Sequence, residues 1–329
     1  MHLFLTILLL LLSRFTVKLD GLDQLISWGT GGRTGHTTIA VWDDDELYVC
    51  ESTDASPFGS YWPPPYGIIR TPWDQWITQA VNASFAVVVL PLSKEASQAF
   101  SAVEFWKWFK TVQGMPYGYH VMLYSFLDTY APARNLPAPF QDSSIDYMLP
   151  WLDRLVGHDN TTEGANMYAL IGEGLNHRLK TNCTGAKMMD CLSTILVERN
   201  LSYAHATSIP ENDAWTYDGG NYSMMCSAFV AHSLKASMGS FLPKLNAHEF
   251  TPKDVYQLGV YEKKVATPRF NYSNCPHNSL IVSDQGYAYC QVIGDFVLEL
   301  NEYNTVAPYA HMNEACAAQW PDYATQRPC

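Results

Sequence analysis

The chain has 329 residues, of which 47% are hydrophobic and 16% are charged, and its formal net charge is −12. This composition is typical of a compact protein with a substantial core. The negative charge, together with the absence of any basic cluster, argues against a nucleic-acid-binding protein.

The chain begins with an apolar run, Leu3 to Leu12, that is followed by Arg14 and Lys18. The run is short for a helix that spans a bilayer, so it predicts a secretory signal peptide over residues 1–19. An uncleaved signal anchor is the alternative, because no small-residue cleavage site is obvious. No later stretch is long and apolar enough for a membrane helix, so we expect no stable membrane span in the mature chain.

Two β-rich runs come next, His36 to Trp42 and Leu47 to Glu51, with an acidic turn between them. This pattern predicts a β-hairpin. Antiparallel pairing would bring Glu51, at the end of the second strand, close to His36, at the start of the first. A carboxylate in that place holds an imidazole in one tautomer and stabilises its cation. The alternative is a loop histidine that bonds only to backbone.

The middle of the chain alternates loops with regular elements. The proline-rich segment from Ser52 to Pro72 predicts an irregular loop over the sheet, and Phe85 to Leu92 predicts a buried strand. Ser97 to Thr111 predicts one helix. Five of its apolar residues are expected to point inward: Phe100, Val103, Phe105, Trp106 and Phe109.

The region from about residue 128 to 220 predicts a helical insertion. Its expected helices lie near Ile145 to Leu155, Ala165 to Arg178 and Met188 to Asn200. A short helix from Pro252 and β-like stretches follow. The β-like stretches are Ser279 to Val282, Gly286 to Ile293 and Phe296 to Leu300. We therefore expect one main domain over residues 20–265 and a cysteine-containing C-terminal extension over residues 266–329.

One cysteine is placed as a nucleophile would be. Gly219 and Gly220 disfavour helix and Ser223 is a good N-cap, so a helix is expected to begin just before Cys226. The free N–H groups and the dipole of a first helical turn favour a thiolate. An apolar stripe of Phe229, Val230 and Leu234 anchors the helix in a core. The alternative is a buried structural cysteine.

Eight cysteines in a secreted chain should mostly form disulfides. Sequence proximity suggests the pairs Cys183–Cys191, Cys275–Cys290 and Cys316–Cys329, although spacing does not fix connectivity. Cys50 and Cys226 are then left over as thiols. A Cys50–Cys226 disulfide is the structural alternative.

The chain carries several N-glycosylation sequons, which fit a eukaryotic secretory pathway. Candidate acceptors are Asn82, Asn160, Asn182, Asn200 and Asn271. A sixth sequon, at Asn221, is doubtful because a glycan there would stand close to Cys226. No phosphate loop or zinc-ligand spacing appears, so neither a cofactor nor a metal is expected.

Three short motifs carry a resemblance to a known family. They are Gly-His36-Thr-x-Ile-x-Val, then Leu-Tyr-Val-x-Glu51-Ser, and much later Cys226-Ser-x-Phe-Val. They resemble the circularly permuted branch of the NlpC-type papain-like hydrolases, the YiiX-like group, in which the histidine and the acid precede the cysteine. The resemblance covers about residues 20–240. This chain has Gly21-Leu-Asp23 where the family often has Gly-Asp, and the insertion matches nothing in it.

The resemblance implies an α+β fold in which a nucleophile helix packs on a central antiparallel sheet, with residues 20–265 as the catalytic domain. It makes Cys226 the nucleophile, His36 the general base and Glu51 the residue that orients the base. A turn at Gly114-Met-Pro-Tyr117 also resembles one of this superfamily. Tyr117 and Ser227 are therefore candidate substrate-binding or oxyanion residues, with a packed aromatic turn as the alternative for Tyr117.

An ordinary triad order would instead pair Cys226 with a downstream histidine, such as His248 or His277. Neither of these lies at a strand edge, so His36 is the preferred base.

The expected function is that of a secreted cysteine hydrolase that cleaves a peptide or amide bond through an acyl-enzyme on Cys226. Related folds act on peptides, amides and acyl groups, including peptidoglycan stem peptides and N-acyl lipids. Acyl transfer is a variant of the same chemistry, and a noncatalytic glycoprotein that uses the fold as a binding module is the alternative. We expect a secreted or lumenal protein, and a lysosome-like compartment is among the candidate locations.

Overall fold

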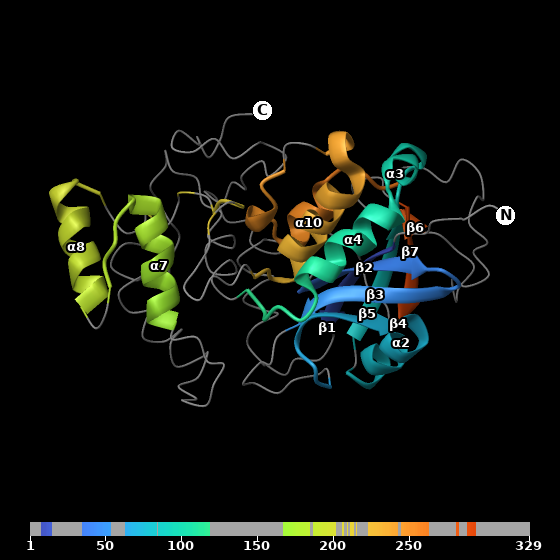
Figure 1. Cartoon of the computed structure of the whole chain (residues 1–329). Helices are drawn as coiled ribbons and strands as arrows, with labels where there is room; N and C mark the ends of the chain where they lie inside the picture. Colours follow the sequence, from blue (N-terminus) through green and yellow to red (C-terminus); the bar gives the residue numbers. More distant parts are fainter. Residues whose placement is uncertain are drawn as a thin grey trace.

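The computed structural model has an α+β architecture, with helices on both faces of an antiparallel sheet (Figure 1). The residues that the structure describes are 8–14, 35–53, 63–83, 85–118, 167–184, 187–201, 206, 209, 211–213, 215, 223–242, 245–262, 281–282 and 288–293. The predicted α+β class is confirmed at this level.

The described strands form one sheet in the order β4-β3-β2-β1-β5-β7-β6, and every neighbouring pair is antiparallel. The strands are β1 (Leu8–Arg14), β2 (His36–Asp43), β3 (Glu46–Thr53), β4 (Gly67–Pro72), β5 (Phe85–Pro91), β6 (Ile281–Val282) and β7 (Ala288–Ile293). The predicted hairpin is β2 and β3. Asp44 makes its turn with a φ of 53°, a left-handed conformation that Asp tolerates well.

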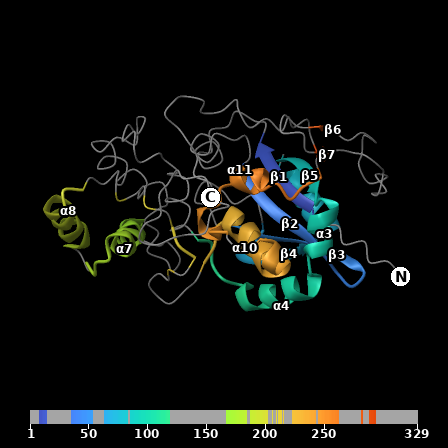
Figure 2. The same cartoon turned by 90° about the horizontal axis from the view of Figure 1, so that it is seen from above.

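Helices cover the two faces of the sheet separately. Helix α2 (Trp73–Asn82) packs on one face, and α4 (Ala102–Val112) and α10 (Cys226–Met238) pack on the other (Figures 1 and 2). The shorter helices are α3 (Lys94–Ala99), α11 (Pro252–Gln257), η2 (Gly239–Phe241) and η3 (Ala247–Glu249). The chain thus forms three layers.

Strand alternation divides the apolar side chains between the two cores. On β2, Ile39 and Val41 belong to the core beneath α4 and α10, whereas Ala40 belongs to the core beneath α2. On β3, Cys50 joins the first core and Val49 the second. This is the period of two that a pleated strand imposes.

Two predictions about the middle of the chain are wrong. The expected loop from Ser52 to Pro72 includes β4, which pairs with β3, and α2 follows it directly. The expected single helix is two helices, because the chain turns extended at Phe100 and Ser101 then caps α4 by accepting a hydrogen bond from the Glu104 N–H. Val103, expected to be inward, is 75% exposed, since the buried stripe of α4 runs through Phe105, Trp106, Phe109 and Val112.

The predicted insertion contains α7 (Met167–Leu179) and α8 (Met188–Glu198), which lie to one side of the sheet and its covering helices (Figures 1 and 2). The helix expected near Ile145 to Leu155 lies outside the described residues. In the predicted C-terminal extension, β7 pairs with β5, so the extension contributes to the central sheet. The stretch from Phe296 to Leu300 lies outside the described residues.

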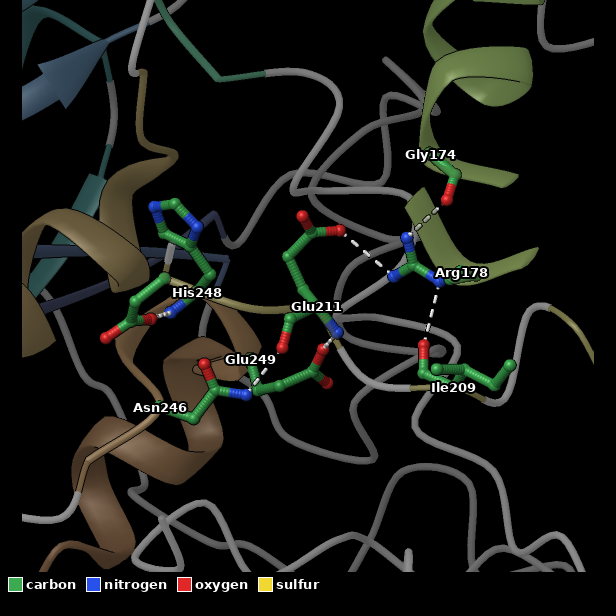
Figure 3. A network of polar contacts seen from close by, with 8 residues as sticks. Gly174, Arg178, Ile209, Glu211, Asn246, His248 and Glu249 are labelled. Carbon is green, nitrogen blue, oxygen red and sulfur yellow. Dashed lines mark hydrogen bonds and ion pairs between the residues drawn. The ribbon is translucent and has the colours of Figure 1, made fainter. Parts of the chain in front are cut away.

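A buried polar network joins α7 to the segments beside α10 (Figure 3). Arg178 on α7 donates from Nη2 to Glu211 Oε2 at 3.0 Å and from Nε to the Ile209 carbonyl at 2.8 Å. Both charged side chains are fully buried. The Glu211 backbone accepts from Asn246 Nδ2 at 2.6 Å, and its N–H donates to the Glu249 carboxylate. The insertion is therefore tied to the main body through charge-assisted bonds.

Part of the apolar N-terminal run forms a strand of the central sheet. Leu8–Arg14 is β1, which lies between β2 and β5 in the middle of the sheet. Cleavage after residue 19, as the signal peptide prediction has it, would remove β1 from between β2 and β5. The mature N-terminus, read by mass spectrometry, decides whether residues 8–14 are retained.

The cysteines give the first testable prediction. The structure links Cys183 to Cys191 and leaves Cys50 and Cys226 as thiols. Cys290 is disulfide-bonded to a residue outside the described part of the chain. Non-reducing peptide mapping by mass spectrometry should therefore recover the Cys183–Cys191 pair. In the denatured protein, Cys50 and Cys226 should both be alkylated, because neither is in a disulfide. A Cys50–Cys226 or other Cys226 disulfide in the native protein would contradict this arrangement.

Candidate functional site

The hairpin brings His36 and Glu51 into direct contact. Ile39 pairs with Cys50, so His36 and Glu51 both lie on the opposite face from that pair. Their side chains meet there, with His36 Nε2 2.9 Å from Glu51 Oε2. The glutamate side chain is 1% exposed and the histidine side chain 16%. The structure thus joins two of the predicted site residues, through a carboxylate that is shielded from water.

A tryptophan that sequence reasoning did not single out holds the other oxygen of this carboxylate. Trp76 Nε1 donates to Glu51 Oε1 at 2.8 Å, and both groups are buried. Trp76 lies on α2, the helix whose sequence was expected to follow a loop. No local signal marks Trp76 as a site residue, because it meets Glu51 only when α2 packs on the sheet.

Cys226 is the first residue of α10, as predicted, but the predicted cap is wrong. The N-cap is Met225, which makes no side-chain cap bond, while the Ser223 hydroxyl donates to the Pro116 carbonyl instead. Two contacts fix this segment through Met224, whose carbonyl accepts from Ser52 Oγ at 2.7 Å and from the Gly118 N–H at 3.1 Å. The start of α10 is therefore held between β3 and the turn after α4.

Glycine is required at position 118 for this arrangement. A Cβ there would lie 2.8 Å from backbone atoms of Met224. Any larger residue would push the two segments apart.

Cys226 and His36 form a mutually charged pair. Burial alone would raise the pKa of the Cys226 thiol, but the charge of His36 and its hydrogen bond to the sulfur lower that pKa below its ordinary value. Burial likewise opposes the His36 cation, yet the charge and hydrogen bond of Cys226, together with those of Glu51, raise the pKa of His36 to about 10. Each charged group therefore stabilises the other, which favours a thiolate beside an imidazolium. Because Nε2 faces Glu51, Nδ1 is the ring nitrogen available to the sulfur.

Backbone donors complete the surroundings of the sulfur. The N–H groups of Thr37 and Ser227 both hydrogen-bond Cys226 and help to lower its pKa. Ser227 was predicted as an oxyanion residue, and its backbone lies at the sulfur while its side chain is fully buried. Tyr117, the other such prediction, forms a bridge with Met224 and is half-buried against the main core. Its position is that of a packed aromatic turn.

The rival bases lie elsewhere. His248, on η3, packs its ring against that of His232 at 4.8 Å and its backbone N–H donates to Asp213 Oδ1 at 2.9 Å. Burial lowers the pKa of His248, and it lowers that of His232 to about 3. His277 lies outside the described residues. Only His36, among the described histidines, hydrogen-bonds the Cys226 sulfur.

Three of the candidate glycosylation sites are described, and all three are exposed: Asn82, Asn182 and Asn200. Asn160, Asn221 and Asn271 lie outside the described residues. Within the described part of the chain, no helix has both the length and the apolar character needed to cross a membrane.

The thiolate–imidazolium pair predicts an unusual pH dependence of alkylation. Cys226 should react with iodoacetamide below pH 9.0, the ordinary pKa of a thiol, because its thiolate persists as the pH falls. His36→Ala removes the cation that offsets the burial of the thiol. The pH at which alkylation becomes fast should therefore rise above the ordinary pKa of a thiol. Rates are measured by peptide mass spectrometry across pH.

Cys50 is the internal control for that experiment. It is as buried as Cys226, but its pKa is raised well above the ordinary value whereas that of Cys226 is lowered, so only Cys226 should be labelled as the pH falls. Identical pH profiles for wild type and His36→Ala would refute the pair.

Trp76→Phe tests the support of Glu51. The change keeps an aromatic ring but leaves a buried carboxylate oxygen without its indole donor, which should cost about 1–3 kcal/mol of unfolding free energy. Cys226 alkylation at neutral pH should also slow, because Glu51 can then turn away from His36. The control is Trp73→Phe, since Trp73 stacks on Trp76 from a half-buried position. Equal effects of the two changes on alkylation would exclude a specific role for the Trp76 hydrogen bond.

No family model, no curated protein and no solved structure matches the chain.

Proposed function

We propose that this protein is a thiol-dependent amidase or peptidase with Cys226 as the nucleophile, His36 as the general acid–base and Glu51 as the residue that orients His36. The observation that carries this proposal is the hydrogen-bonded chain from the sulfur through the imidazole to a buried carboxylate. A cysteine at a helix start, paired with a charged histidine, is activated in the way that thiol hydrolases require.

The acylation step follows from the ion pair. The Cys226 thiolate attacks the substrate carbonyl carbon, forming an S–C bond and placing the negative charge on the carbonyl oxygen. Backbone N–H groups at the helix start, among them that of Ser227, are the available donors to this oxygen. The intermediate collapses as the C–N bond breaks, and His36 gives its proton to the departing amine. A thioester on Cys226 is left behind.

In deacylation His36 acts as a base, whereas it acted as an acid in acylation. Neutral His36 takes a proton from water while the water oxygen attacks the thioester carbonyl. The C–S bond then breaks, releasing the carboxylic acid and restoring the thiolate beside the imidazolium. Throughout both steps Glu51, held by Trp76, keeps Nε2 engaged so that the other ring nitrogen faces the sulfur. An acyl acceptor other than water would make the same protein an acyltransferase.

The finer fold proposal is a permuted papain-like arrangement. Its support is the chain order of His36, Glu51 and Cys226, together with a nucleophile helix packed on an antiparallel sheet. The proposed substrates are peptides, amides or N-acyl compounds. A disulfide at Cys183–Cys191 and exposed sequons are compatible with a secreted or lumenal site of action.

Activity of matched variants tests the function. Against a panel of small amide and thioester substrates, Cys226→Ala and His36→Ala should fall to near background, because one removes the nucleophile and the other its proton carrier. Glu51→Gln should be milder, since the amide still bonds the ring and only the charge is lost. Circular dichroism confirms that each variant is folded.

His248→Ala serves as the matched histidine control and should keep its activity per folded molecule. Full activity in Cys226→Ala would refute the mechanism, and a dead His248→Ala beside an active His36→Ala would move the base. Failure of the wild type to acquire any acyl group, by intact mass, across the panel would favour the noncatalytic binding module.

A further inference from the structure

A second cluster of chemically active side chains lies further along the nucleophile helix. His232 is on α10, about 9 Å along the axis from Cys226 at the usual helical rise. His248 on η3 and Asp213, from the segment before α10, converge on it. One ligand atom of each of the three residues lies within 4.8 Å of those of the other two. None of them contacts the Cys226 sulfur through a described hydrogen bond, so the proposed hydrolysis does not use them.

We propose that Asp213, His232 and His248 form a binding site for a divalent cation of the zinc class. Two imidazole nitrogens and one carboxylate oxygen are the donor set that borderline ions such as Zn²⁺ take, with water as a fourth ligand. The residues are far apart in the chain, so no short motif could have indicated this site.

The geometry needs only side-chain adjustment to hold an ion. His232 Nε2 is 3.8 Å from Asp213 Oδ1. Ligand atoms around a tetrahedral zinc lie about 3.3 Å apart, given bonds of about 2.0–2.1 Å. The backbone N–H of His248 already donates to Asp213 Oδ1, which fixes the carboxylate beside the two rings. Rotations that move the ligand atoms by roughly 1 Å close the site.

The three side chains are buried to different degrees, which suits an ion with one coordination position open to water. The His248 side chain is fully buried, whereas those of His232 and Asp213 are 10% and 20% exposed. The site is therefore closed to water at His248, and its solvent side lies at the carboxylate. An ion and its water ligand enter from that side.

The ammonium group of Lys235 balances the charge of Asp213, as a bound ion would. Its Nζ is 2.8 Å from Asp213 Oδ2 and also donates to the Leu245 carbonyl at 2.9 Å. A shielded carboxylate needs a cationic partner, and this ammonium supplies one. The lysine side chain is 36% exposed, so it can swing into solvent on its flexible stem when a metal ion takes over. Metal and Lys235 therefore compete for Asp213.

A bound ion would link the nucleophile helix to two other segments of the chain. It would tie α10 to η3 and to the segment at Asp213, which adjoins the Arg178–Glu211 network of the insertion. Because the unfolded chain holds no such constellation, binding would raise the stability of the folded protein in proportion to the logarithm of the free ion concentration.

Titration of the full-length chain with zinc chloride tests the proposal. After removal of metal with a chelator, the Cys226→Ala protein is used as the parent, so that the catalytic thiol offers no competing ligand. Calorimetry should show one Zn²⁺ per chain and thermal unfolding should shift upward. Asp213→Asn and His232→Gln should each weaken binding by at least about 100-fold, the upper range for loss of a supporting residue. Lys235→Met should strengthen it by about tenfold or more, since a competing charge is removed.

Cobalt substitution gives a readout that does not depend on any variant. Co²⁺ in the wild-type protein should show the visible absorption of a nitrogen- and oxygen-ligated tetrahedral ion at one equivalent, without a sulfur charge-transfer band. Absence of Zn²⁺ binding by the parent protein, or undiminished binding in both Asp213→Asn and His232→Gln, would overturn the proposal. Weaker binding in Lys235→Met than in the parent would refute the competition with Lys235.

Discussion

The arrangement of the candidate site depends on one buried negative charge, the carboxylate of Glu51. A charge taken out of water is costly unless it is fully partnered. Here one oxygen accepts from the Trp76 indole and the other meets His36, so α2 and the β2–β3 hairpin must both be in place. The partnered carboxylate then supports a cation on His36, and that cation supports a thiolate on Cys226.

The sheet lets groups from its two sides meet at this point. Glu51 and Trp76 belong to the side covered by α2, whereas α10 lies on the side covered by α4. Cys226 is the first residue of α10, so it lies at the edge of the helical layer. From that edge its sulfur can reach His36. Ser52, the neighbour of Glu51, points to the other side and bonds Met224. One strand thus positions both Glu51 and the start of α10.

Much of this arrangement is local enough to be predicted from sequence. The hairpin follows from two β-rich runs and an acidic turn, and the spacing of the runs is sufficient to bring His36 to Glu51. The start of α10 follows from the residues around Cys226, although the expected serine cap does not form. The buried stripe of α4 follows from helical periodicity, with Val103 the exception. These features depend on contacts within one element or one turn.

What the sequence by itself determined is therefore that Cys226 begins a helix and that His36 and Glu51 lie close together in one hairpin, because residue type and strand or helix period carry that information. Only the tertiary structure decided the rest. Trp76 reaches Glu51 through the packing of α2 on the sheet, and Gly118 approaches Met224 from a distant turn. Asp213, His232 and His248 converge from three segments. Such contacts join residues far apart in the chain, and their geometry is set by how helices pack on a sheet, which no local pattern encodes.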